Sequence, residues 1–144
     1  MVTDFIKQQL EVLYPNDAIK PTAVYTKRAG NLLHLCADFE FNINEVALVD
    51  LVQSLHPTPA VSGVPVTKSL EFIKAFETHE RKYYAGFLGP INKEAAHIYV
   101  NLRCAAVEKS QLTLYVGGGI TSESNIAAEW EESQRKAETL LNVI

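Results

Sequence analysis

Three absences narrow the function of this 144-residue chain. Lys and Arg residues number 13 against 17 acids and are scattered, so there is no basic patch to attract a phosphate backbone. No apolar run reaches membrane-spanning length, and an acid, Asp4, stands where a secretion signal would have its apolar core. We therefore expect no nucleic acid partner, no membrane span and no secretion.

Cysteine is also scarce, because Cys36 and Cys104 are the only two and lie far apart in apolar, strand-like runs. This spacing fits neither a zinc site nor a disulfide framework. We predict two buried thiols in a reducing compartment, with the cytoplasm as the expected location. The hydrophobic content of 47%, without a repeat or a linker, predicts one domain over residues 1–144.

Helical and strand periods alternate in the first part of the chain. Apolar residues at helical spacing predict a helix over about residues 3–14, which a Pro-Asn-Asp cluster should end. Strands are expected at 23–26 and 31–41, with a turn at 27–30 between them. A second helix should follow Asn42.

Prolines dominate the segment between residues 57 and 65, which contains three of them. Each proline lacks an amide donor and restricts the residue before it. We therefore expect an ordered loop without regular structure here. A third helix should follow, with Thr67 as its cap.

After residue 80 the apolar period changes to two, which predicts antiparallel strands at 82–88, 95–107 and 112–118. The middle strand should turn one face to the core and the other, which carries Arg103, towards a ligand. A closing helix is predicted at 125–142. The whole pattern indicates an α+β fold, an antiparallel sheet meander with packed helices.

The closing helix places Glu129, Glu132 and Lys136 within an arc of about 60°. Beside this arc runs an apolar stripe of Ile126, Trp130, Ala137, Leu140 and Ile144. Two neighbouring carboxylates need a cation, and oxygen ligands suit Mg²⁺. The alternative is an ordinary i,i+4 pair of Glu132 and Lys136, worth a few tenths of a kcal/mol, and the helix alone favours it.

Five ordered segments change this balance, because together they resemble the chorismate-binding family of isochorismate, anthranilate, salicylate and aminodeoxychorismate synthases. The segments are 55–63, 81–86, 102–105, 114–120 and 129–136. The first contains His-Pro-Thr-Pro-Ala-Val and is similar to that of isochorismate synthases. The resemblance implies the C-terminal part of the layered fold of anthranilate synthase component I, and Mg²⁺-dependent conversion of chorismate to isochorismate.

The resemblance also implies roles for charged residues. Glu132 matches a glutamate that binds Mg²⁺ directly, and Glu129 matches one that acts close to the metal. Arg103 and Lys136 match residues that hold the carboxylates of chorismate, in keeping with the need of a dianion for fixed cations. For Arg103 the alternative is a cross-strand ion pair.

Uncharged positions complete the implied substrate site in this part of the family pattern. Gly117 and Gly119 match glycines whose backbone amides approach a substrate carboxylate, although a triple glycine alone is more typical of a turn. Gly118 departs from the pattern, which more often has alanine there. Tyr84 matches an aromatic position lining the pocket, with a core tyrosine as the alternative.

The proline-rich segment contributes His56, Ala60 and Val61 to the implied substrate site. His56 is expected near the reacting side of the ring, and the other two are expected to shape the pocket. Lys82 stands where the family commonly has a small residue. The remaining histidines match no family position and are predicted to be structural or surface residues; they are His34, His79 and His97.

The base, the acid and a further metal-binding glutamate of the family have no match in this chain and are expected upstream. We therefore predict no catalytic residue in this segment and no turnover by the chain alone. Self-association is expected through a surface that the rest of the family fold covers. Two alternatives stay open: a segment of a salicylate or anthranilate synthase, and a non-catalytic remnant or binding protein. The residues fit either menaquinone or siderophore biosynthesis.

Overall fold

The computed structural model describes residues 1–29, 32–43 and 47–142. Contacts divide the chain into two units, Met1–Ala75 and Phe76–Ile144, and we describe each unit by itself. Helices and two-stranded antiparallel sheets make up both, so the predicted α+β class is confirmed. Within the described ranges no helix is long and apolar enough to cross a membrane.

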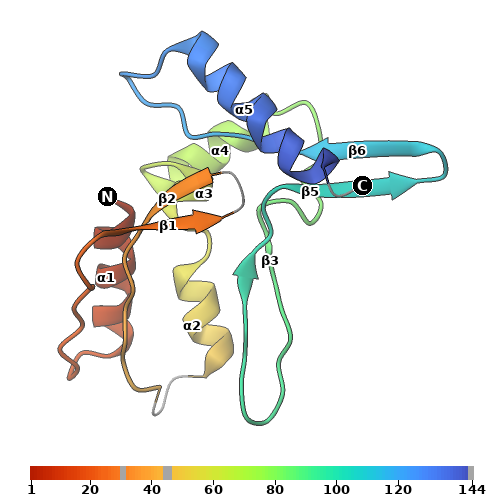
Figure 1. The fold of residues 1–144 in the computed structure, drawn as a ribbon. Coiled ribbons are helices and arrows are strands. Elements are labelled where there is room, and N and C mark those ends of the chain that lie inside the picture. The colour runs from red at the N-terminus through yellow and green to blue at the C-terminus, as the bar shows by residue number, and fades with distance from the viewer. Residues whose placement is uncertain (30–31, 44–46, 143–144) are drawn as a thin grey trace. The chain divides into compact units, whose positions relative to one another are not determined.

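In the first unit the helices α1 (Val2–Leu13) and α2 (Leu48–Leu55) lie side by side, and the chain between them forms an antiparallel hairpin (Figure 1). The strands of the hairpin are β1 (Tyr25–Ala29) and β2 (Leu32–Cys36). The first helix lies within one residue of the prediction. The second starts later than expected after Asn42, and residues 44–46 lie outside the described part.

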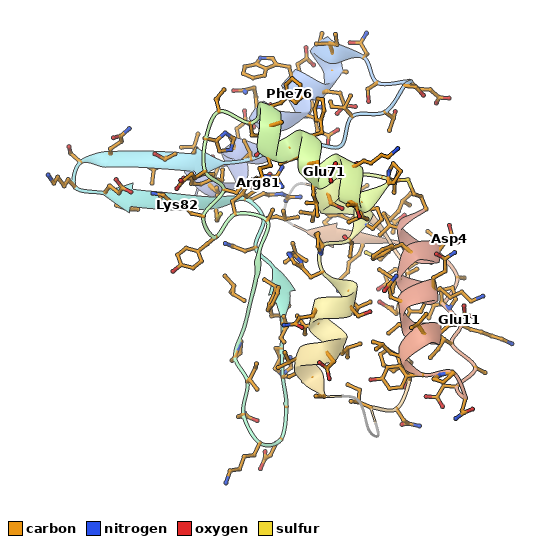
Figure 2. The ribbon with its side chains drawn as sticks, turned by 180° about the vertical axis from the view of Figure 1, so that it is seen from behind. Asp4, Glu11, Glu71, Phe76, Arg81 and Lys82 are labelled. Carbon is orange, nitrogen blue, oxygen red and sulfur yellow. The ribbon has the colours of Figure 1, made fainter. Side chains whose placement is uncertain are left out.

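The core of the first unit is small and apolar. Leu10, Tyr14, Ile19 and Leu51 are buried, and Leu10 is only 1% exposed. Leu10 and Tyr14 share a face because they are four residues apart. The ring of Tyr14 packs against Phe41 with 5.0 Å between centroids. By contrast, Asp4 and Glu11 are exposed on the same helix (Figure 2).

The hairpin and the cysteines differ from the predictions. β1 continues through Ala29, with Lys27 opposite His34 in the register, so the turn expected at 27–30 begins too early. β2 ends at Cys36 and does not reach residue 41. Cys36 and Cys104 are free thiols, as predicted, but both are only half-buried.

The prediction of no regular structure between the prolines was wrong, because α3 (Pro59–Ser62) forms there. Pro59 occupies the first helical turn, where a missing amide costs nothing. The amides of Val61 and Ser62 donate to Thr58 O at 2.9 and 3.0 Å. Gly63, at a φ of 85°, ends the helix in a conformation that glycine tolerates.

α4 (Val66–Phe76) confirms the third helix, but it begins one residue before Thr67, which therefore lies inside it and is not its cap.

The second unit contains two hairpins and a long closing helix (Figure 1). Its elements are β3 (Phe87–Leu88), β4 (Tyr99–Val100), β5 (Cys104–Glu108), β6 (Gln111–Tyr115) and α5 (Ile126–Leu141). β3 pairs with β4, and β5 pairs with β6. The backbone ladder of the first hairpin extends beyond β3 and β4, because Asn101 N donates to Gly86 O at 2.8 Å.

The single strand predicted at 95–107 was wrong, since the chain there forms two short strands with different partners. Arg103 has a φ of 51° between them, in the left-handed region. Such a residue interrupts the alternation of side chains. Tyr99 and Val100 are both exposed, so the predicted division into a core face and a ligand face does not hold.

The closing helix confirms its predicted bounds. Asn125 caps it, because the side-chain oxygen of Asn125 accepts a hydrogen bond from Ala128 N at 3.1 Å. The predicted apolar stripe is wrong at its start, where Ile126 is 87% and Trp130 66% exposed. Ala137 and Leu140 are half-buried, and Ile144 lies outside the described residues.

Candidate functional site

The site begins at Lys136, which joins α5 to the segment after β6. Its Nζ contacts Glu132 Oε1 at 2.6 Å and donates to Gly117 O at 3.2 Å. Only 18% of the Lys136 side chain is exposed. Lys136 therefore does more than a surface i,i+4 pair would, because it links the helix to the glycine segment.

The carboxyl of Glu132 is held ionised by this contact. The hydrogen bond from Lys136 is the main cause that lowers the pKa of Glu132, and the charges of Lys136, Arg135 and Arg103 add to it. Arg103 therefore lies within electrostatic reach of Glu132. Lys136 therefore contacts Glu132 directly, whereas Arg103 acts on it only as a minor electrostatic influence, and the roles of both cations in substrate binding stay predictions.

Glu129 lies on the same side of α5, where its Oε1 accepts a hydrogen bond from Ser124 Oγ at 2.6 Å. A Cβ added at Gly118 would lie 3.5 Å from Glu129 Oε2 and 3.7 Å from Lys136 Nζ. Both side chains therefore border Gly118. The distances are ordinary contacts, which agrees with the alanine that the family pattern more often has there.

The donor set fits a magnesium ion in part. Throughout the described ranges, no group of three or more His, Cys, Asp or Glu side chains could by itself hold a metal ion. Mg²⁺ keeps several waters and uses one or two carboxylates, so Glu129 and Glu132 fit as two of its ligands. The contact of Glu132 with Lys136 would have to loosen for the carboxylate to bind a metal.

Tyr84 reaches the same glycine segment. A Cβ at Gly117 would lie 2.9 Å from the Tyr84 hydroxyl, so this position needs glycine for the two to approach. The Tyr84 ring stacks on Tyr115 with 5.8 Å between centroids. Burial raises the pKa of Tyr84, which keeps the hydroxyl protonated and able to donate a hydrogen bond. Gly119, in contrast, faces open space, with nothing within 4 Å of an added Cβ.

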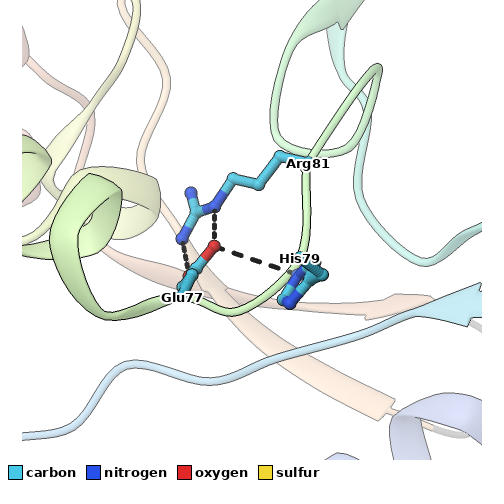
Figure 3. A network of polar contacts seen from close by, with 3 residues as sticks. All are labelled: Glu77, His79 and Arg81. Atoms are coloured by element: carbon cyan, nitrogen blue, oxygen red, sulfur yellow. Dashed lines mark hydrogen bonds and ion pairs between the residues drawn. The ribbon is translucent and has the colours of Figure 1, made fainter.

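Sequence analysis missed a polar network of Glu77, His79 and Arg81 (Figure 3), whose Arg81 lies over the Tyr84 ring. Arg81 Nε donates to Glu77 Oε2 at 2.7 Å, and a second guanidinium nitrogen of Arg81 binds Glu77 Oε1. His79 Nε2 lies 3.9 Å from Glu77 Oε2. Helical spacing could not have found this pair, because α4 ends at Phe76 and both Glu77 and Arg81 lie in the non-helical segment after it.

His56, Ala60 and Val61 belong to the first unit, whereas the other predicted site residues belong to the second. His56 follows α2 as its C-cap, and burial lowers the pKa of its imidazole, which favours the neutral form of the ring. Ala60 is exposed and Val61 half-buried within α3. Their roles in substrate binding stay predictions.

Comparison with known proteins identifies the class. Residues 1–144 match the family described as "Chorismate binding enzyme". The chain is 32% identical to the putative isochorismate synthase MenF of Mycobacterium tuberculosis over 149 residues, which cover 100% of this chain and 40% of that protein. It is 37% identical to the isochorismate synthase EntC of Escherichia coli over 115 residues, 78% of this chain and 29% of that protein.

A third relative, the isochorismate synthase MenF of Haemophilus influenzae, is 32% identical over 121 residues, 83% of this chain and 28% of that protein. The chain belongs to the chorismate binding enzyme family, and the resemblance stated from the sequence is confirmed. It spans 28 to 40% of the length of these three relatives.

Proposed function

We propose that this chain is a segment of a Mg²⁺-dependent isochorismate synthase that supplies ligands for the substrate carboxylates and for the metal. The family and the names of its relatives support this proposal. The single observation that carries it is Lys136, which is mostly covered and contacts both Glu132 and the Gly117 carbonyl. A cation held at a glycine segment suits the recognition of a carboxylate.

The substrate proposed is chorismate, and the product isochorismate, because a substrate with two carboxylates needs fixed cations, and Lys136 and Arg103 match the family residues that hold them. Lys136 and Arg103 bind carboxylate oxygens, and the backbone amides at Gly117 and Gly119 approach one of them. The protonated Tyr84 hydroxyl donates a further hydrogen bond. Substrate-binding roles for His56, Ala60 and Val61 of the first unit are proposed from the family resemblance alone.

Glu132 and Glu129 are proposed to hold Mg²⁺. When bound, the metal neutralises and orients a substrate carboxylate as a Lewis acid. The chain's own contribution is to bring two carboxylates to one side of α5, which the capping Asn125 fixes at its N-terminal end. Loss of magnesium should therefore weaken chorismate binding.

Isochorismate formation needs a base that activates water for attack at C2 and an acid that protonates the leaving 4-hydroxyl. We assign neither role to a residue of this chain. The isolated chain is therefore expected to show no turnover, which chromatography of chorismate incubated with purified chain and MgCl₂ would test. An isochorismate peak that grows with the amount of chain would overturn this part of the proposal.

Binding is the direct test of the proposed site. Chorismate is titrated calorimetrically into the purified chain with and without MgCl₂, and then into Lys136→Met. We expect at least about tenfold weaker binding for the variant, because a charge-assisted contact is lost. Arg135→Met removes a cation from the exposed side of the same helix and is the matched control. Equal affinities of the two variants would refute the role of Lys136.

The proposal extends to assembly and location. Large apolar side chains of the second unit are exposed, among them Tyr83, Ile126 and Trp130. Exposed apolar surface promotes association, so we expect a homodimer or larger in light scattering, and a monomer at high concentration would contradict this.

The free thiols Cys36 and Cys104 support a reducing compartment, and the cytoplasm is the proposed location.

A further inference from the structure

The Tyr84 ring is held on two sides by its own unit. The guanidinium carbon of Arg81 lies 5.7 Å from the Tyr84 ring centroid, and the Tyr115 ring lies 5.8 Å away at an interplanar angle of 26°. A cation over an aromatic face attracts the ring. Together these contacts restrict where the Tyr84 hydroxyl can lie.

The backbone around Tyr84 is equally restricted. Tyr84 N donates to Arg81 O at 2.7 Å, which closes a turn between the two residues. Ala85 follows at a φ of 62°, and its amide donates to Asn101 O at 2.8 Å. The turn therefore ties the Arg81 and Tyr84 side chains to one rigid frame.

Arg81 is in turn fixed by Glu77. Two guanidinium nitrogens bind the two carboxylate oxygens, and the side chains are only 25% and 29% exposed (Figure 3). Such a fork-to-fork pair fixes the plane of the guanidinium as well as its position. A lysine at this position would keep the charge but not the plane.

The series of contacts from Glu77 through Arg81 and Tyr84 ends at Gly117, whose carbonyl oxygen Lys136 binds. The Tyr84 hydroxyl approaches Gly117 closely enough that a Cβ there would lie 2.9 Å away, and Gly117 O accepts from Lys136 Nζ. We propose that Arg81, held by Glu77, is a positioning residue that fixes the Tyr84 ring against Gly117 and so shapes the substrate-carboxylate site. The identity of the ligand in this inference rests on the proposed function, whereas the positioning of Tyr84 by Arg81 does not.

Two readouts test it on the intact 144-residue chain. The first is the nuclear Overhauser effect between the Tyr84 ring protons and the Gly117 α-protons, which needs no ligand. We expect it in the unsubstituted chain, and expect it to fall several-fold in Arg81→Gln and in Glu77→Gln. Arg135→Gln is the matched control, because it breaks another i,i+4 Arg–Glu pair, at 3.8 Å from Glu131. The control should leave the signal unchanged.

The second readout is chorismate affinity, which should fall about tenfold in Arg81→Gln and less in Arg81→Lys, which keeps the cation. If the unsubstituted chain binds no chorismate, the proposed function fails while the proton signal still decides the positioning role. If Arg81→Gln does not fold, Glu77→Gln decides, because it retains the guanidinium and loses only the charged partner. An unchanged Tyr84–Gly117 signal in a folded Glu77→Gln variant would overturn the inference.

Discussion

The two units of this chain are held together by different interactions. In the first, Leu10, Tyr14, Ile19 and Leu51 form an apolar core. In the second, the only buried residue among those described is Ala85, at 8% exposed, and the named contacts are backbone hydrogen bonds, stacked rings and ion pairs. Apolar burial stabilises without regard to direction, whereas polar contacts fix geometry. The unit with the weaker core thus carries the charged site.

The largest expected effect is on the apolar core of the first unit. Leu10→Ala removes the most deeply buried side chain and should lower the free energy of unfolding by about 3 kcal/mol. Urea denaturation followed by circular dichroism measures it. Val12→Ala, on the same helix but 75% exposed, is the control and should change stability by less than about 0.5 kcal/mol. Similar losses for both would mean that the first unit has no organised core.

The next largest effect is expected in the β3–β4 hairpin of the second unit, which has no large apolar core. A Cβ at Gly89 would lie 1.7 Å from His97 O, so Gly89→Ala must push the two sides of the β3–β4 hairpin apart. We expect a loss of about 2 kcal/mol and faster exchange of the Asn101 amide, which bonds to Gly86 across the hairpin. Gly119→Ala meets no atom within 4 Å and serves as the control. Unchanged exchange in Gly89→Ala would contradict the hairpin geometry.

A smaller effect distinguishes neighbouring glycines of the site. Gly117→Ala should displace the Tyr84 hydroxyl and cost about 1 kcal/mol in chorismate binding, measured by calorimetry. Gly118→Ala should be tolerated, because its Cβ would lie at ordinary contact distances from Glu129 and Lys136. The reverse order of the two affinities would show that the glycine segment binds differently.

The smallest effect is the response to acid. Hydrogen bonds from Arg81 and Lys136 lower the pKa of Glu77 and Glu132. A carboxyl whose pKa is lower in the folded than in the unfolded chain stabilises the fold. This stabilisation is fully present above the pKa of the unfolded chain, about 4.3, and is lost as the pH falls through the pKa of the folded chain. For Glu77 we expect less than about 1 kcal/mol.

Nuclear magnetic resonance from pH 7 to pH 3 checks this prediction. Tyr84 signals of the second unit should shift before the methyl signals of Leu10 in the first, which is 1% exposed within a cluster of Tyr14, Ile19 and Leu51. Asp4 also has a lowered pKa, from its hydrogen bond with the N-terminus, but that pair is exposed. Glu77→Gln should remove part of the Tyr84 response. Simultaneous shifts in both units would show that the acid response is not local to the polar contacts.

The sequence predicted best where a local signal and its partner lie on one element. The bounds of α5 followed from Asn125 and the helical period, and the side chains of Glu132 and Lys136 meet because they are one turn apart. It predicted least where the backbone departs from a regular pattern. The left-handed conformation of Arg103 divides an apparently continuous strand, and periodicity alone contains no sign of it.

Contacts between elements explain the other differences. Ile126 and Trp130 belong to the apolar stripe of α5 in the sequence, but both are exposed. The contact of α5 with the glycine segment is instead made by Lys136, which binds Gly117 O. The contacts around Tyr84 were also out of reach of sequence patterns. The ion pair of Glu77 and Arg81, and the position of the Arg81 guanidinium over the Tyr84 ring, both depend on the non-helical turn after α4.

Each sheet in the described part of the chain has two strands, so every strand there is also an edge strand. One row of its amides and carbonyls has no neighbouring strand to bond to, and such rows readily accept an extended segment from elsewhere. An unpaired backbone edge, and not only exposed apolar surface, is thus a place where each of these ribbons can gain a further strand.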